Sequence, residues 1–252
     1  MRVMIGLALL LLFMPPSAVA ATSTPLEFGA TALVDVDATG KAHVVEMQKV
    51  STLEDVPSLA PIVERIKGRL KDAIESWQFV PAMQDGIAVR SQTHVVVQLE
   101  GTDDGAGGMA VRVRSAAPGA GMRRMDMSRL QAAVTMAQAE GFVTLDLTYD
   151  ATGKVVGSEL VDSKALSDAG FTGKADKELR RGALAESRTW ELDPELVDGH
   201  PRSGSGRITL IFCLSPRCGT TPLPGEEGPD PQQFASNDPA VKLRSNVAGT
   251  GL

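Results

Sequence analysis

The sequence predicts an α+β protein with two tandem modules, each a three-stranded antiparallel sheet packed by one helix in the order β-β-α-β. Three observations lead to this prediction: an ungapped internal repeat, apolar residues that alternate with polar ones, and apolar residues spaced three or four positions apart. We place the first module at 26–100 and the second at 128–218, and we expect an extra helix at the start of the second.

The internal repeat defines this organisation. The string Asp-Ala-Thr-Gly-Lys at 37–41 recurs at 150–154, which is 113 residues further on. The same spacing relates Glu46, Trp77, Pro81 and Asp85-Gly86 to Glu159, Trp190, Pro194 and Asp198-Gly199. Because no gap is needed between these matches, we interpret the chain as the product of a duplication.

The strands follow the same order in both modules. First strands are expected at 31–37 and 142–149, where apolar and polar residues alternate as in a half-buried strand. The repeated string then forms a hairpin turn, because its glycine adopts a positive φ and its Asp side chain bonds the turn backbone. Second strands follow at 43–50 and 155–161, and last strands at 93–99 and 207–213.

A helix is expected between the second and the last strand of each module. Apolar residues recur there at helical spacing, namely Ile62, Ile66, Leu70, Ala73 and Trp77, and more thinly Leu179, Ala183 and Trp190. We expect each Trp to fill the gap between helix and sheet. The extra helix of the second module is expected from Ser128, a good N-cap residue, to Glu140.

The segments outside the modules differ in composition. Residues 1–20 combine Arg2, an apolar run and Ala18-Val19-Ala20, which is typical of a secretory signal peptide cleaved after Ala20; an uncleaved membrane anchor is the alternative. Residues 101–127 are rich in Gly and Ala, and we expect a linker that allows one short edge strand. Residues 219–252 are rich in Pro, Gly and polar residues, and we expect disorder.

Two cysteines, Cys213 and Cys218, are the only ones in the sequence. In an exported protein we expect them to pair across the short loop between them, and two free thiols are the alternative. Such a disulfide would staple one loop and contribute little to the whole fold.

The composition and the motifs argue against several classes of function. The formal net charge of -6 argues against a nucleic-acid partner, because phosphate binding needs a basic face. None of His43, His94 and His200 has a second ligand at the spacing of a metal site, and neither a nucleophile elbow nor a phosphate loop occurs. We therefore expect no metal, no cofactor and no enzymatic activity.

The repeated residues resemble the C-terminal domain family of TonB, the energy transducer of the bacterial cell envelope. That family has two strands joined by a Gly turn, a helix that ends in Trp, a Pro four residues later, and a last strand. The matching segments here are Trp77-Gln78-Phe79-Val80-Pro81 and, less closely, Trp190-Glu191-Leu192-Asp193-Pro194. The chain departs from TonB in its cleavable signal, in its two modules and in its lack of a long Pro-rich span.

The resemblance implies a periplasmic protein that binds an envelope protein, such as a TonB-dependent outer-membrane receptor, by adding an extended segment of it to a sheet edge. The last strands are the expected edges, with candidate binding residues Thr93, Val95, Val97, Leu99, Arg207, Ile208, Leu210 and Phe212. A link to energy transduction for transport follows from the same resemblance. The alternative is a structural or assembly protein of the envelope that pairs its edges in a homodimer, without energy transduction.

Overall fold

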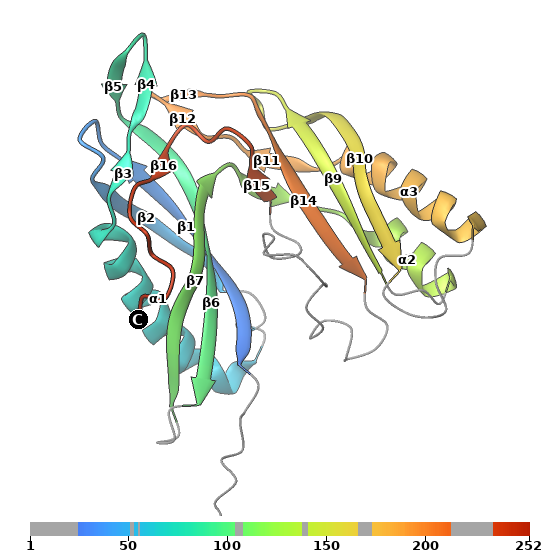
Figure 1. Cartoon of the computed structure of the whole chain (residues 1–252), viewed down its shortest axis with the longest axis horizontal. Coiled ribbons are helices and arrows are strands. Elements are labelled where there is room, and N and C mark those ends of the chain that lie inside the picture. The colour runs from blue at the N-terminus through green and yellow to red at the C-terminus, as the bar shows by residue number, and fades with distance from the viewer. Residues whose placement is uncertain are drawn as a thin grey trace, which may run out of the picture.

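The computed structural model describes residues 25–50, 53–54, 56–103, 108–137, 141–165, 173–212 and 234–252. Antiparallel sheets and three α-helices make up these residues, and the predicted α+β class is therefore confirmed (Figure 1). The expected signal peptide at 1–20 and the expected pair Cys213 and Cys218 lie outside the described residues. Within the described part of the chain, no helix is both long and apolar enough to cross a membrane.

The first half of the fold is a sheet covered by one helix. Its elements are β1 (Leu26–Val36), β2 (Ala42–Val50), α1 (Ala60–Ser76), β6 (Ser91–Asp103) and β7 (Met109–Gly119), with a short 3-10 turn (Pro57–Leu59) before α1. β1 lies between β2 and β6, and β7 pairs with the other side of β6. α1 packs next to β2 and buries Ile66 and Leu70 of the stripe that the sequence predicts, together with Val63 and Ile74 beside them.

The second half is a four-stranded sheet covered by two helices. Its elements are α2 (Ser128–Ala137), β9 (Gly141–Tyr149), β10 (Val155–Ala165), α3 (Gly173–Ser187), β14 (Gly204–Phe212) and β15 (Phe234–Ser236). The strand order is β10-β9-β14-β15. α3 packs on β10 and β9, and α2, the extra helix expected from the sequence, packs against α3.

Several short strand pairs complete the fold, and the first two named below join the two halves. These are β3 (Phe79–Val80) with β16 (Lys242–Leu243), β8 (Gly121–Arg124) with β11 (Glu191–Asp193), β4 (Ala82–Gln84) with β5 (Ile87–Val89), and β12 (Leu196–Val197) with β13 (His200–Pro201). The chain that leaves the first half supplies β8 to the second, and the chain that leaves the second half supplies β16 to the first. β12 also pairs with β6, so the halves share backbone hydrogen bonds in both directions.

The two hairpin turns have the same hydrogen bonds. In each turn the Asp carboxylate accepts the main-chain N–H groups of the residues two and four positions later. These distances are 2.8 Å from Thr39 and 3.0 Å from Lys41 to Asp37 Oδ1, and 2.9 Å from Thr152 and 3.2 Å from Lys154 to Asp150 Oδ1. The repeated Asp therefore organises both turns, as an Asx turn does.

Each turn is also held against the chain that follows the helix. Gly40 has φ 84° and its carbonyl accepts the N–H of Phe79 at 3.0 Å. Gly153 has φ 86° and its carbonyl accepts the N–H of Leu192 at 2.8 Å. A Cβ at Gly40 or at Gly153 would lie 2.1 Å from Phe79 O or 1.9 Å from Leu192 O, so both positions require glycine.

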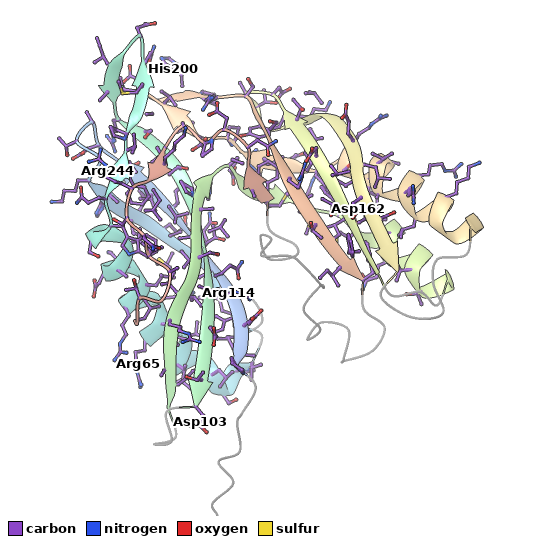
Figure 2. All side chains as sticks on the ribbon, viewed as in Figure 1. Arg65, Asp103, Arg114, Asp162, His200 and Arg244 are labelled. Atoms are coloured by element: carbon purple, nitrogen blue, oxygen red, sulfur yellow. The ribbon has the colours of Figure 1, made fainter. Side chains whose placement is uncertain are left out.

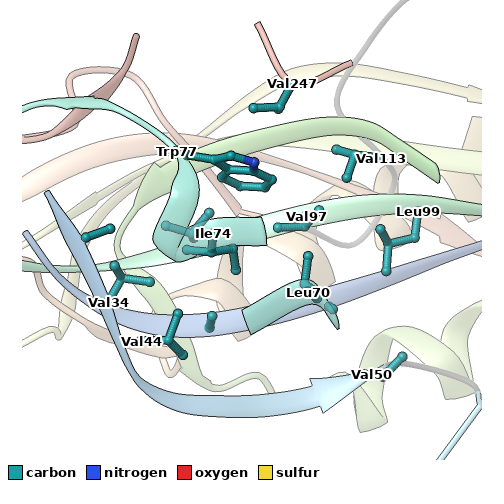
Figure 3. Close-up of a cluster of buried hydrophobic side chains, with 14 of the residues drawn as sticks. Val34, Val44, Val50, Leu70, Ile74, Trp77, Val97, Leu99, Val113 and Val247 are labelled. Atoms are coloured by element: carbon teal, nitrogen blue, oxygen red, sulfur yellow. The ribbon is translucent and has the colours of Figure 1, made fainter. Parts of the chain in front are cut away.

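Two separate hydrophobic clusters form the core of the molecule. One lies between α1 and the first sheet and contains Trp77, which is 5% exposed (Figure 3). The other lies between α2, α3 and the second sheet and contains Trp190, which is fully buried. Both Trp residues follow the last turn of their helix, where each main-chain N–H bonds a carbonyl three residues earlier.

Two expectations about the connecting segments are wrong. The expected linker at 101–127, which allowed one short edge strand, contains the long strand β7 and also β8, because Val111 and Val113 are buried in the first cluster and β7 pairs with β6 over ten positions. The expected disorder of 219–252 is contradicted over 234–252, where Val241 and Val247 are buried in the first cluster. This segment needs few apolar residues of its own to be ordered, because Val241 and Val247 pack on apolar side chains that the first cluster supplies.

Candidate functional site

The predicted edge at 93–99 is not an edge, and this expectation is wrong. β6 pairs with β1 on one side and with β7 on the other, so its hydrogen-bonding groups are used on both sides. Val95, Val97 and Leu99 are fully buried in the core. Thr93 is buried at the junction between the halves, where its hydroxyl donates to Glu195 Oε1 at 2.8 Å.

The predicted edge at 207–213 is partly occupied. Arg207 and Ile208 pair with Ala235 and Phe234 of β15, and the described pairing with β15 ends at Ile208. The side chains of Ile208, Leu210 and Phe212 are buried in the second cluster. Arg207 pairs with Asp146 of β9 at 2.7 Å on the polar face of the sheet. The chain therefore adds its own strand to the edge that the sequence offers to a partner.

Both outer strands, β2 and β10, remain at the edges of their sheets. The edge of β2 is capped by carboxylates, because Glu75 Oε1 accepts the N–H of Val44 at 3.0 Å and Glu54 Oε1 accepts the N–H of Val50 at 3.1 Å. Such caps occupy the groups that a further strand needs. Sequence reasoning did not identify them, since the carboxylates reach β2 from α1 and from the turn before it.

The edge of β10 has no such protection. Within the described residues, no side chain from another element bonds a main-chain N–H of β10, and Arg188 stands where the repeat spacing matches Glu75. The pairing of β10 with β9 shifts register after Val155 and after Leu160. Val156 and Val161, the residues at these shifts, are 61% and 45% exposed. A regular stretch at 157–160 between two exposed valines is the open edge of the described structure.

The junction between the halves is organised by one buried carboxylate. Glu195 is 2% exposed, and its second oxygen, Oε2, accepts the main-chain N–H of Ala240 at 2.8 Å. Burial raises the pKa of the Glu195 carboxyl above its ordinary value. Thr93 and Ala240 are far apart in the sequence, so Glu195 connects β6, the loop after β11 and the segment that leads to β16.

Replacing Glu195 with alanine is expected to lower the free energy of unfolding by about 1–3 kcal/mol, because the buried N–H of Ala240 loses its acceptor and the Thr93 hydroxyl retains only backbone carbonyls such as Gly119 O. Glu195→Gln should cost about half as much, since its carbonyl oxygen retains one of the two donors. Urea unfolding measures both changes, and hydrogen exchange should show faster opening at 240–243. Equal stability of Glu195→Ala and the unchanged chain would contradict this role.

A second buried polar group at the junction is His94. Its ring is 4% exposed and lies against Gly121, and its Nδ1 has no hydrogen-bond partner. Burial lowers the pKa of His94 below 6.5, although the carboxylates of Asp193 and Glu46 partly oppose this shift. The folded protein therefore holds the imidazole neutral at pH values where the unfolded chain binds a proton.

Stability is expected to fall as the pH drops through 6.5, because the unfolded chain then binds a proton that folded His94 resists. One such group contributes a slope of at most about 1.4 kcal/mol per pH unit. His94→Phe removes the titrating group and should flatten this part of the profile. Urea unfolding between pH 7.5 and 5 compares the two proteins, and parallel profiles would exclude His94 as the cause.

The remaining candidate residues do not come together in a chemical site. His43 lies beside Glu75 at the exposed end of β2, and His200 lies on the exposed strand β13 (Figure 2). In the part of the chain that the structure describes, no three His, Cys, Asp or Glu residues are placed to hold a metal ion. The expectation of a protein without metal, cofactor or catalytic activity stays a prediction. Comparison with protein-family models, with curated proteins and with solved structures found no match to the chain.

Proposed function

We propose that this chain is an exported, non-enzymatic protein of the bacterial cell envelope, built from two TonB-like modules, that binds a protein partner by strand addition. The two-module origin is supported by the turns of Asp37 and Asp150, whose hydrogen bonds recur at the repeat spacing. It is also supported by the paired Trp residues that follow α1 and α3. The proposed partner is an outer-membrane receptor or another envelope component, with a link to TonB-dependent transport.

The single observation that carries the proposal is the open edge of β10. The strands β6 and β14 instead receive strands of the same chain, since β7 covers β6 and β15 covers part of β14. β15 adds to β14 through only three residue pairs, so a stretch as short as 157–160 suffices for strand addition. On β2 the corresponding groups are capped by Glu75 and Glu54. The binding site is therefore proposed at β10 rather than at the two last strands.

The partner segment is extended and apolar on one face. Val156 and Val161 flank the open stretch and offer apolar contacts at its two ends, while the main chain of 157–160 supplies the hydrogen bonds. The main-chain hydrogen bonds then provide affinity, and contact with the two valines selects partner segments that have apolar side chains at the matching positions. α3 lies beside β10 and forms the wall of the site, joined to it by the Ser158 and Ser187 hydroxyls at 2.6 Å.

The test titrates the isotope-labelled chain with peptides from the N-terminal segments of TonB-dependent receptors. The amide signals of 157–160 are expected to shift, and the double variant Val156→Lys/Val161→Lys should bind at least tenfold more weakly, because charged side chains block strand addition. Val45→Lys is the matched control, since Val45 is 49% exposed on the capped strand β2.

Two outcomes would contradict the proposal. The first is the absence of any shift in the β10 signals at saturating peptide. The second is an equal loss of affinity in Val45→Lys and the β10 double variant. A dimer that the double variant abolishes, without any peptide binding, would favour the alternative of a structural protein that self-associates through this edge.

A further inference from the structure

A groove between α1 and β7 is filled by the last part of the described chain, residues 246–252. This segment pairs along β7, with Gly249 N bonding Val113 O at 2.8 Å, Val113 N bonding Thr250 O at 2.8 Å and Leu252 N bonding Val111 O at 2.9 Å. On the other side, Arg69 of α1 donates to Leu252 O at 2.9 Å. Figure 1 shows the segment as the red trace that runs between the helix and the strand. The molecule therefore contains an example of strand addition to β7.

The segment is anchored by one buried side chain. Val247 is 5% exposed and belongs to the same cluster as Trp77 and Val113, next to which it lies in Figure 3. The residues around it, Asn246 and 248–251, are exposed. The segment therefore contacts the rest of the protein through Val247, Leu252 and the main-chain hydrogen bonds to β7. A peptide that binds by strand addition uses the same combination of main-chain bonds and a few buried side chains.

In the second half, a helix rather than an extended segment packs next to the Trp that follows the long helix. β8 pairs with β11 there as β16 pairs with β3, and the chain after β8 continues as α2, which buries Leu130 and Val134. Trp190 Nε1 donates to Asp126 O at 2.8 Å just before that helix, whereas within the described residues Trp77 Nε1 has no such partner. An extended segment in the first half thus stands where a helix packs in the second.

The extended segment leaves its groove incompletely filled. A cavity of about 110 Å³ remains beside Leu252, and its walls are Ile62, Arg65, Ile66, Arg69, Gly108, Met109, Val111 and Leu252. The walls are apolar except for the two arginines. Within the described residues, no carboxylate forms an ion pair with Arg65, which projects from α1 (Figure 2). The groove accepts a larger apolar side chain than Leu252, together with a negative charge.

We propose that the groove between α1 and β7 is a second strand-binding site, occupied in cis by residues 246–252 and in trans by an extended partner segment with an aromatic residue followed by an acidic one. The aromatic ring fills the cavity beside Leu252, and the carboxylate pairs with Arg65 and Arg69. The chain's own segment has leucine where the aromatic ring is expected, which favours a different protein over a second copy of this chain as the partner. This site is separate from the edge of β10.

The test uses the isotope-labelled full chain and three peptides based on residues 242–252. The first has the native sequence, the second has Leu252→Phe followed by Asp, and the third adds N-methylation at position 252 to the second. Because the cis segment competes at an effective concentration of about 1 mM, the native peptide should half-displace it near that value. The second peptide should need at least threefold less, through added apolar burial and the charge pair.

N-methylation separates strand addition from nonspecific apolar contact. The methyl group at position 252 removes the N–H that bonds Val111 O, and should weaken displacement at least fivefold. The matched control carries the methyl group at Gly251, whose N–H points away from β7 because its neighbours make the bonds to this strand. Displacement is followed by the amide signals of Gly249 and Leu252 and by the Trp77 indole signal.

A protease site inserted between Ser245 and Asn246, in the loop after β16, provides a second measurement on the full chain. After cleavage the segment is no longer tethered, so each peptide should displace it at a concentration at least tenfold lower. Three results would overturn the proposal: no advantage of the second peptide over the first, equal displacement with and without the methyl group at position 252, or a cut segment that leaves only in denaturant. The amide signals of 157–160 report on binding at β10, whereas those of Gly249 and Leu252 report on the groove. A negative result in the groove therefore leaves the proposed function at β10 to be judged separately.

Discussion

Replacing Trp190 with alanine is expected to lower the free energy of unfolding by about 4 kcal/mol, the largest effect predicted for a single side chain. Trp190 is fully buried in the second cluster. Truncation of a buried Trp to Ala usually costs about 3–5 kcal/mol through lost burial and the cavity that remains. Here it also removes the donor to Asp126 O, which holds the chain at the start of α2.

Two variants separate these contributions. Trp190→Phe keeps most of the apolar volume and loses the hydrogen bond, so it should cost about 1–2 kcal/mol. Trp77→Ala should cost about 3 kcal/mol, because Trp77 is 5% exposed and its neighbour Val247 belongs to the shorter covering segment. Urea unfolding measures all three, with circular dichroism to check the fold. A cost below 2 kcal/mol for Trp190→Ala would mean that the second half does not depend on this residue.

Replacing Gly153 or Gly40 with alanine is expected to cost at least about 3 kcal/mol at either position. Both glycines have positive φ, which alone costs an alanine about 1 kcal/mol. In addition, the new Cβ would lie 1.9 Å from Leu192 O or 2.1 Å from Phe79 O, and backbone atoms move only with the strand that carries them. The turn would therefore separate from the segment that follows the helix, and one hydrogen bond would be lost.

The matched controls for this experiment are Gly86 and Gly199. They have φ values of 79° and 76°, but a Cβ at either position meets no atom within 4 Å. Gly86→Ala and Gly199→Ala should therefore cost only the conformational term of about 1 kcal/mol. Thermal or urea unfolding of the four variants compares them directly. If all four variants lose the same stability, then the positive φ, and not the close approach of backbone atoms, is the reason why glycine is needed at Gly40 and Gly153.

The sequence predicted local structure well where the signal is local. The Asp-Ala-Thr-Gly-Lys string at both positions forms the expected turn, since an Asp that bonds two amides and a glycine at positive φ need no distant partner. The stripe that includes Ile66 and Leu70 faces the sheet as expected, because helical spacing alone determines which residues share a face.

The prediction that 93–99 is a free sheet edge was wrong because the sequence does not specify the order of the strands in the sheet. Val95, Val97 and Leu99 alternate correctly for a strand, but alternation does not state which neighbours a strand has. β7 covers this strand although its sequence at 109–119 contains Gly, Ala and three polar residues, because the main chain that makes the ladder is the same for every residue type except proline. The Glu75 carboxylate that caps β2 likewise comes from a position 31 residues further along the chain.

The sequence by itself determined the repeated elements, their turns and the two Trp residues, because these depend on interactions between residues close along the chain. Only the tertiary structure decided which edges are covered, that β10 is left open, and that residues 241–252 cross back to the first half. Strand pairing and groove filling depend on the backbone surfaces that the folded elements present to one another. Such surfaces exist only after the halves have packed, and no local pattern encodes them.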